Sequence, residues 1–505
     1  MSEAEKELVQ LDALYEKIKD FYNANFTYIL IALLAGAFLF RLKYMGINAA
    51  VWWDEADYLN LARDYATDIP SNAAPWRARA MPLFWSIFYR FGATEWFIRF
   101  FGQIIAVAGV YITYRAGKDF FNKHVGLIAG FMMTVFWLPM FWSTRVSLGV
   151  YALVLWGMAA LFFWHGYVLK KSNWYLFASG AIIAFGIFAY DSVGFIIPFL
   201  FIYLLLADRF KFLKSKKMLY FIVGGLLVGT PFLIWNYVDF NGYFEGHDSI
   251  IFALYPRLGR TYTADIETSE QMPDQQWQRS IPTLMKDMFK FYTELPYIIK
   301  WPFVIAFIIG LGSFLNLILG FDILIKGKSK KLKKDFFILG WLIVSVGMVS
   351  ALYTFTNFAF EPRLWFPAYP ALFVVCALGV MAIFNFLKKY NKVVALAVIL
   401  VLLGFGAHAN YIHGNNLINN KKDTYIHENL AGTWLKDNSQ PGDTIAGCGL
   451  SVPLIYYSER LFYPYQYENL TFMNEKKSKF FVMDFYDPSC HPQEFLQAYS
   501  EEIKP

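Results

Sequence analysis

The sequence predicts an all-α polytopic membrane protein with a small extracytoplasmic α/β domain at its C-terminal end. Hydrophobic residues make up 57% of the 505 residues and charged residues only 17%, whereas soluble domains usually carry about a quarter charged residues. Apolar runs close to the length of a bilayer crossing recur along the chain. Beyond about residue 412, Asp, Asn, Pro and Gly become frequent again, which predicts a soluble domain. Aromatic residues amount to 20%, which excludes a disordered chain.

The first 25 residues differ in pattern from the apolar segments that follow. Apolar side chains recur at helical spacing between Glu and Lys in residues 3–22, which predicts an amphipathic helix on the cytoplasmic membrane surface. Residues 26–411 form the predicted transmembrane domain. A bilayer crossing needs about 20 apolar residues, and about eleven segments approach that length. They are residues 26–43, 97–115, 124–142, 146–167, 174–190, 192–207, 218–237, 297–320, 336–354, 365–386 and 393–411.

Lysine and arginine gather in alternate connections between these segments. Cytoplasmic loops of membrane proteins carry an excess of both residues. With eleven spans, all the basic clusters fall on one side, which is therefore the cytoplasm and also holds the N-terminus. The net charge of +6 thus follows from membrane topology, and we expect no nucleic-acid partner. The clusters lie at residues 115–123, 170–171, 209–217, 326–334 and 388–392.

The remaining connections face the outside of a plasma membrane in this topology. Two of them are long, residues 44–96 and residues 238–296. Within the second, residues 281–294 carry apolar side chains on one helical face, which predicts a helix at the membrane interface.

The tail, residues 412–505, also faces outward and is the predicted α/β domain. A helix is expected over residues 423–437, and short buried strands are expected in the segments GDTIAGCG and KFFVMDFYDP. Cys448 and Cys490 lie in this tail, where an oxidising compartment would allow them to form a disulfide.

The sharpest candidate for chemistry is the segment VWWDEADYLNLARDYA at residues 51–66, directly after the first span. Asp54 and Glu55 are adjacent, Asp57 lies one helical turn after Asp54, and two tryptophans precede them. Acidic residues in the first turn of a helix interact favourably with its dipole, so a solvated helix start is one explanation. A carboxylate pair held at the bilayer surface by interfacial tryptophans is partly desolvated, which favours a charge partner or a catalytic function.

Four arginines on the same predicted face could oppose this acidic pair. Arg77 and Arg79 occur in PWRARAMPLFW, Arg145 in FWSTRVSLGVYAL and Arg363 in FEPRLWFPAYPAL. Each one alone is typical of a long side chain that extends from apolar surroundings to the membrane interface. Together with the acidic pair, they suit an anionic substrate that is held at the membrane surface beside a carboxylate base.

These motifs resemble those of the GT-C glycosyltransferases. The most similar branch contains the protein O-mannosyltransferases and the lipid A aminoarabinose transferases (glycosyltransferase family 39 and its relatives). WWDEADYL is similar to the first-loop motif of that branch, RAMPLFW to its basic-Pro-Leu segment, and RLWFPAYPAL to its late R-Y-x-x-P-x-x-P signature. The resemblance covers roughly residues 26–386 and implies a GT-C fold.

The resemblance also implies a reaction and roles for the residues. Such enzymes move a sugar from a polyprenyl-phosphate carrier, usually with inversion, to a protein, lipid or glycan acceptor on the external face. Asp54 matches the catalytic aspartate and is expected to be the general base. Arg79 and Arg363, with Arg77 as an alternative, are expected to hold the phosphate. Glu55 either orients the acceptor or, with Asp54, helps to bind a divalent cation such as Mg²⁺ or Mn²⁺.

One departure from the family pattern concerns a second acidic residue. Many relatives carry it a few positions after the arginine that corresponds to Arg145, where residues 146–149 of this chain read VSLG. Asp191 is expected to face outward at membrane depth and is the candidate substitute, which adds it to the substrate-binding set. A structural break between two helices explains Asp191 equally well.

A transporter or flippase for lipids or glycolipids, without covalent chemistry, is the alternative from another functional class. Transporters often show internal repeats and ionisable residues near the bilayer midplane. Here the ionisable residues gather at one membrane face, which favours an enzyme at that surface. An oligosaccharyltransferase would share the architecture, but its soluble domain usually carries a Trp-Trp-Asp signature, and the tail contains only Trp434.

Overall fold

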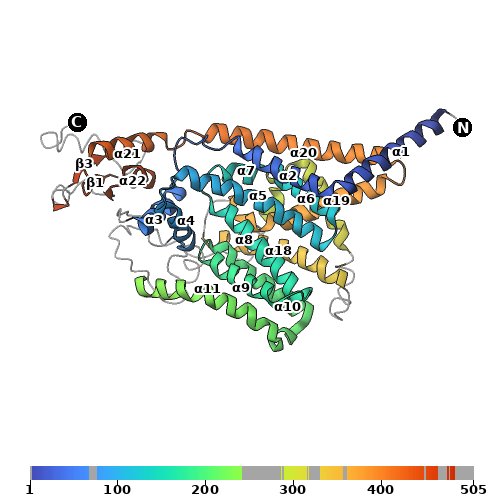
Figure 1. Ribbon diagram of the computed structural model, residues 1–505, viewed down its shortest axis with the longest axis horizontal. Coiled ribbons are helices and arrows are strands. Elements are labelled where there is room, and N and C mark those ends of the chain that lie inside the picture. Colours follow the sequence, from blue (N-terminus) through green and yellow to red (C-terminus); the bar gives the residue numbers. More distant parts are fainter. Residues whose placement is uncertain are drawn as a thin grey trace.

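The computed structural model describes residues 3–67, 77–240, 286, 289–315, 317, 330–356, 361–448, 451–464, 475–476 and 478–483. These residues form a bundle of apolar helices with a small α/β domain at one end (Figure 1). The predicted fold class is confirmed. Half of the predicted interfacial helix at residues 281–294 lies outside the described residues.

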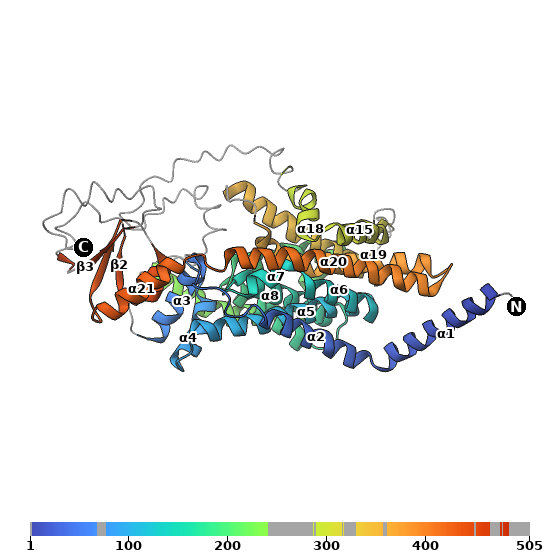
Figure 2. The same ribbon diagram turned by 90° about the horizontal axis from the view of Figure 1, so that it is seen from above.

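Two helices begin the chain and meet at a sharp angle. They are α1 (Glu3–Ala24) and α2 (Phe26–Leu42), and their axes differ by 75°. The predicted N-terminal helix is therefore present. It projects from the end of the bundle that is opposite to the α/β domain (Figures 1 and 2).

Helices continue through the bundle in nearly unbroken succession, and α3 and α4 lie at its end beside the α/β domain (Figure 1). In chain order the bundle elements are α5 (Glu95–Phe120), α6 (Lys123–Val135), α7 (Trp137–Ser143), α8 (Leu148–Phe163), the π-helical η1 (Trp164–Val168), α9 (Asn173–Ile187), η2 (Asp191–Phe195), α10 (Ile196–Asp208), η3 (Arg209–Lys214), α11 (Lys216–Phe240), α14 (Leu295–Ile298), α15 (Trp301–Leu311), η5 (Gly312–Phe314), α18 (Lys330–Thr356), η6 (Pro362–Ala368), α19 (Tyr369–Leu387) and α20 (Lys392–Lys421).

Every predicted span corresponds to a helical segment, but not all of these segments have the full length of a crossing. Seven helices in the described part of the chain are long and apolar enough to span a membrane. The bent pairs α1–α2 and α6–α7 raise that number to nine if each pair is one span. The two remaining predicted spans, residues 174–190 and 297–320, correspond to α9 and to the helix at Trp301–Phe314, which are apolar but shorter.

Two of the basic connections lie at the same end of the bundle, as the predicted topology requires. At the end near α1, Lys123 donates a hydrogen bond to Asn23 at 2.9 Å, and Lys392 lies 3.6 Å from the carboxylate of Glu16. The basic connections that follow α5 and α19 therefore share the end that carries α1. The α/β domain lies at the opposite end, together with α3 and α4 (Figure 1).

Glycines allow α15 and α19 to pack with their backbones in contact. A Cβ atom added to Gly379 in α19 would lie 1.8 Å from the carbonyl oxygen of Ala306 in α15. One added to Gly310 in α15 would lie 1.9 Å from the carbonyl oxygen of Val375. Close approach at small residues is the usual way in which helices associate within a membrane.

We expect the substitution Gly379→Val to destabilise the bundle, because the added side chain forces α15 and α19 apart. The expected loss is about 1–3 kcal/mol in the free energy of unfolding, the usual cost of overpacking. Thermal unfolding of the purified protein in detergent measures it. Gly404→Val in α20 is the control, since an added Cβ atom there meets nothing within 4 Å. Equal melting temperatures for the two variants would contradict the packing account.

The α/β domain follows α20, which continues to Lys421, past the predicted end of the last span at residue 411. A three-stranded parallel sheet in the order β2-β1-β3 packs against its two helices. The predicted helix and both predicted strands are present as α21, β1 and β3. The elements are α21 (Ile426–Asn438), β1 (Thr444–Gly447), α22 (Val452–Ser458), β2 (Leu461–Tyr463) and β3 (Ser478–Val482).

The three cysteines differ in state. Cys448 directly follows β1 and is disulfide-bonded. Cys376 is a buried free thiol in α19. Cys490, the predicted partner of Cys448, lies outside the described residues.

Candidate active site

The acidic motif forms the first turn of α3 (Trp53–Ala66), which packs against α4 (Ala80–Arg90). The helix starts at the motif because the side chain of Glu55 accepts the backbone N–H of Trp52 at 3.0 Å, as in a capping box. Acidic side chains in this turn also interact favourably with the helix dipole. Asp54 is the second residue of α3 and remains partly exposed, with 41% of its side chain accessible.

Asp54 lies between two of the predicted arginines. Its Oδ1 atom lies 3.1 Å from Nη2 of Arg77, and its Oδ2 atom lies 2.9 Å from Nη1 of Arg363. Arg363 is 309 positions away in sequence and belongs to η6, so the fold brings the late motif to the first-loop motif. Both guanidinium groups donate hydrogen bonds to one carboxylate at the end of the bundle that carries the α/β domain.

Each of these arginines has a second acidic partner. Asp57 is buried and accepts hydrogen bonds from Nε of Arg77 at 3.0 Å and from Nη2 at 2.8 Å. Glu361 forms an ion pair with Nε of Arg363. The guanidinium of Arg363 also lies 4.7 Å from the ring centre of Trp142. We assigned no role to Asp57 or Glu361 from the sequence, although the helical spacing between Asp54 and Asp57 signals a shared face.

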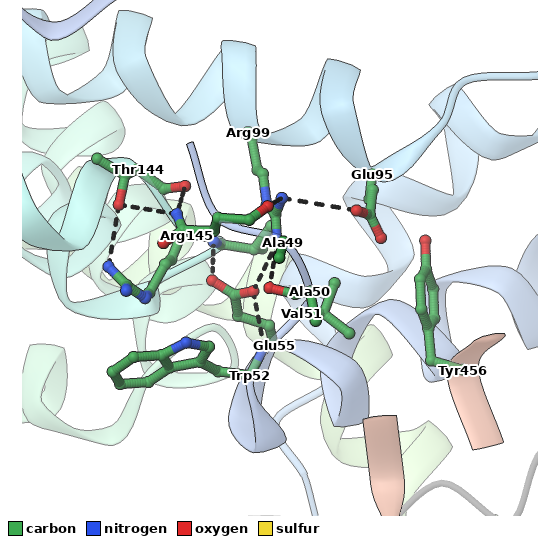
Figure 3. A network of polar contacts seen from close by, with 12 residues as sticks. Ala49, Ala50, Val51, Trp52, Glu55, Glu95, Arg99, Thr144, Arg145 and Tyr456 are labelled. Carbon is green, nitrogen blue, oxygen red and sulfur yellow. Dashed lines mark hydrogen bonds and ion pairs between the residues drawn. The ribbon is translucent and has the colours of Figure 1, made fainter. Parts of the chain in front are cut away.

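Glu55 lies in a buried polar network (Figure 3). Its Oε1 atom accepts the backbone N–H of Val146 at 2.7 Å, and its Oε2 atom lies 3.3 Å from Nη2 of Arg99. Arg99 in turn donates a hydrogen bond to the carbonyl oxygen of Ala50 at 3.0 Å. Glu55 thus ties the start of α3 to α5 and to the turn before α8, which holds the adjacent Asp54 in place.

Arg145 is buried between aromatic rings rather than directed at Asp54. Its guanidinium lies 4.0 Å from the ring centre of Trp52 and 4.2 Å from that of Phe141. It donates hydrogen bonds to the carbonyl oxygens of Phe141 and Lys421, near the C-terminal ends of α7 and α20, where a cation is favoured. Burial lowers the pKa of Arg145 to about 10. Arg145 thus joins Trp52, at the start of α3, to the ends of α7 and α20.

The other two predicted substrate-binding residues are Arg79 and Asp191. Arg79 forms an ion pair with Asp239, and its guanidinium lies 4.8 Å from the ring centre of Trp235 in α11. Asp191 begins η2, the break between α9 and α10, and the position of its side chain lies outside the described part of the structure. The contacts of Asp54 therefore go to Arg77 and Arg363, and not to Arg79.

The α/β domain contacts α3 and the residues that precede it, which the sequence did not predict. The hydroxyl of Tyr457 accepts the backbone N–H of Val51 at 2.8 Å. Arg63 of α3 donates a hydrogen bond to the carbonyl oxygen of Tyr456 at 2.8 Å. The side chain of Asn429 in α21 donates to the carbonyl oxygen of Ala49 at 2.7 Å.

The described acidic residues do not fit the expected divalent cation. Within the described ranges, no group of three or more His, Cys, Asp or Glu side chains is placed to hold a metal ion. Both oxygens of Asp54 accept hydrogen bonds from arginines, and both oxygens of Glu55 accept from backbone or guanidinium donors. The divalent cation stays a prediction.

We expect Glu55→Gln to weaken the site through its geometry. The amide keeps one acceptor oxygen but loses the charge that faces Arg99, which leaves a buried guanidinium less well paired. The expected result is a loss of about 1–3 kcal/mol in the free energy of unfolding. Thermal unfolding measures this loss, and Glu16→Gln, in an exposed pair with Lys19, is the control. A Glu55→Gln protein as stable as the control would show that the network does not hold α3.

A family model matches part of the chain. Residues 75–235 match the model described as dolichyl-phosphate-mannose-protein mannosyltransferase. This stretch contains Arg77, Arg79 and Arg145 but neither Asp54 nor Arg363. A comparison with curated protein sequences gives no match.

The structure as a whole is similar to the solved structures of two other proteins. ArnT from Cupriavidus metallidurans, bound to undecaprenyl phosphate, superposes with a TM-score of 0.62 at 12% identity, over 94% of this chain and 95% of that chain. The archaeal oligosaccharyltransferase AglB from Archaeoglobus fulgidus, in complex with an inhibitory peptide and a dolichol-phosphate, superposes with a TM-score of 0.53 at 13% identity. That match covers 87% of this chain and 64% of AglB.

At such identities the structural similarity shows a shared fold, and function must be argued from the site. The fold is the GT-C fold that the first-loop and late motifs imply. The chain is therefore similar in fold to ArnT and AglB, and its residues 75–235 are similar to the protein mannosyltransferases.

Proposed function

We propose that this protein is a glycosyltransferase that moves a sugar from a polyprenyl-phosphate-linked donor to an acceptor hydroxyl, with Asp54 as the general base. The bridging of Asp54 between Arg77 and Arg363 carries the proposal. One carboxylate and two guanidinium groups in one place supply a proton acceptor and a binding site for phosphate. The ArnT neighbour is bound to undecaprenyl phosphate and the AglB neighbour to a dolichol-phosphate, which supports a polyprenyl phosphate as the carrier.

In the proposed reaction, Asp54 takes the proton of the acceptor hydroxyl as the acceptor oxygen bonds to the anomeric carbon. The bond between the anomeric carbon and the phosphate oxygen breaks on the opposite side, which inverts the configuration. The electron pair of that bond stays on the lipid phosphate, where Arg77 and Arg363 stabilise the negative charge. The products are the glycosylated acceptor, a polyprenyl phosphate and a protonated Asp54 that later releases its proton to water.

We assign the donor phosphate to Arg77 and Arg363 rather than to Arg79. The ion pair of Arg79 with Asp239 directs its guanidinium toward the end of α11, whereas Arg77 contacts the proposed base itself. The acceptor is a protein, a lipid or a glycan. We place the site outside the plasma membrane and the N-terminus in the cytoplasm, because the basic connections lie at the opposite end of the bundle from α3.

Reconstitution separates this function from lipid transport. Purified protein in proteoliposomes is given a polyprenyl-phosphate-mannose that is labelled in the sugar, and the label is followed in two ways. The proposal predicts that label leaves the lipid, either bound to an acceptor from host membranes or as free sugar after attack by water. Movement of intact labelled lipid between leaflets, with no label released from it, would instead identify a transporter.

A further inference from the structure

The same three side chains already serve as partners for one another in the arrangement that the structure shows. Each oxygen of Asp54, the proposed base, accepts a hydrogen bond from an arginine. The N–H groups of Arg77 and Arg363 that suit a donor phosphate are thus directed at a carboxylate. Asp54 and the donor phosphate therefore compete for the same two guanidinium groups.

The charges of this cluster also oppose the entry of an anion. We define the cluster as Asp54, Asp57, Arg77, Glu361 and Arg363, which are joined by ion pairs. Its three carboxylates and two guanidinium groups sum to one negative charge when all are ionised. A donor phosphate adds a further negative charge, so its binding is favoured only if a carboxylate gives up its place beside the arginines.

Asp54 is the member of the cluster that can move. It contacts both arginines, and 41% of its side chain is exposed, whereas only 5% of the side chain of Asp57 is exposed. Partly exposed ion pairs contribute little to stability, so an incoming phosphate can replace them at small cost. Asp57 is held by two hydrogen bonds from Arg77 and keeps that guanidinium in position while Asp54 moves.

We propose that Asp54 occupies the place of the donor phosphate until the donor binds. The phosphate then displaces the carboxylate from Arg77 and Arg363, and the freed carboxylate becomes the base for the acceptor. This inference rests on the proposed function. It means that the base is unavailable before the donor is bound, so the donor must bind first and water is not activated at the empty site.

The affinity for a polyprenyl phosphate tests the displacement directly. Binding of undecaprenyl phosphate to the full-length protein in nanodiscs is compared for wild type and Asp54→Asn. Because the amide competes for the arginines without a charge, we expect the variant to bind the lipid phosphate about tenfold more tightly. Asp54→Glu keeps the charge and is expected to bind no more tightly than wild type.

A matched control separates displacement from general electrostatics. Asp423 is exposed in the turn after α20, so Asp423→Asn removes one negative charge from the same end of the protein. We expect this control to leave the affinity unchanged. An Asp54→Asn protein that folds, as judged by thermal unfolding, and binds the lipid phosphate with wild-type or weaker affinity would overturn the inference. An equal gain in the Asp423→Asn protein would overturn it as well.

The binding experiment needs no turnover, so the two proposals can fail separately. Sugar transfer by wild type with no gain in affinity for Asp54→Asn leaves the proposed function standing and removes the displacement. A gain in affinity without any sugar transfer by wild type leaves the displacement standing and removes the proposed function. A second variant, Asp54→Asn with Arg363→Gln, is expected to lose the gain, because the phosphate then lacks one of the two guanidinium groups that Asp54 had occupied.

Discussion

The Asp54→Asn variant is expected to lose about 10³-fold in the rate of sugar transfer, the effect that a positioned general base usually has. The amide cannot accept the acceptor proton, although it keeps the size of the side chain and can still accept a hydrogen bond from Arg77 or Arg363. Release of labelled sugar from a polyprenyl-phosphate-sugar measures the rate. Asp423→Asn, which makes the same chemical change at an exposed position, is expected to retain the wild-type rate.

Thermal unfolding and lipid binding distinguish a loss of catalysis in this variant from a loss of folding. The Asp54→Asn protein should unfold near the wild-type temperature, since the lost ion pairs are partly exposed and contribute little to stability. It should still bind undecaprenyl phosphate. A well-folded Asp54→Asn protein with a rate within a few-fold of wild type would remove Asp54 from the mechanism.

The second large effect is expected for the arginines that face Asp54. Replacing Arg363 by Gln removes a group that stabilises the developing phosphate charge, and such losses reach about 10²–10³-fold in rate. Arg363→Lys keeps the charge but not the forked geometry, so an intermediate loss is expected. Kinetics with a labelled polyprenyl-phosphate-sugar measure kcat/KM for the donor.

A comparison of Arg77 with Arg79 makes this expectation specific. The two residues belong to the same short motif, but Arg77 contacts Asp54 whereas Arg79 pairs with Asp239. We therefore expect a larger loss of kcat/KM for Arg77→Gln than for Arg79→Gln. The opposite ranking would place the donor phosphate near the end of α11 and would contradict the assignment made from the structure.

The membrane architecture and the meeting of distant motifs were predictable from the sequence, because both follow from strong physical constraints. A bilayer requires long apolar segments, and the basic clusters determine which connections share a face. Asp54 and Arg363 could be placed on one face from these two constraints alone. A shared face allows their direct ion pair, and the tertiary fold forms it.

The separate positions of Asp54 and Glu55 could not be predicted from their adjacency. Successive residues of a helix differ in direction by about 100°, so neighbouring carboxylates at a helix start face different surroundings. Asp54 faces the arginines, whereas Glu55 faces Arg99 and the backbone N–H of Val146. A choice between the two as base therefore requires the orientation of α3.

Arg145 and the α/β domain show a second limit of sequence reasoning. The guanidinium of Arg145 is held by two aromatic rings and by carbonyl groups near the ends of α7 and α20, which only the tertiary fold brings together. The contact between Tyr457 and Val51 joins positions 406 residues apart. Neither contact leaves a periodic pattern in the sequence.

The most direct test of the central claim is a cryo-electron microscopy structure of the protein with undecaprenyl phosphate bound. We predict that the phosphate lies within hydrogen-bond distance of Arg77 and Arg363, and that the carboxylate of Asp54 has left both guanidinium groups. A phosphate bound at the end of the bundle near α1, or one bound away from both arginines while Asp54 keeps its two ion pairs, would contradict the account.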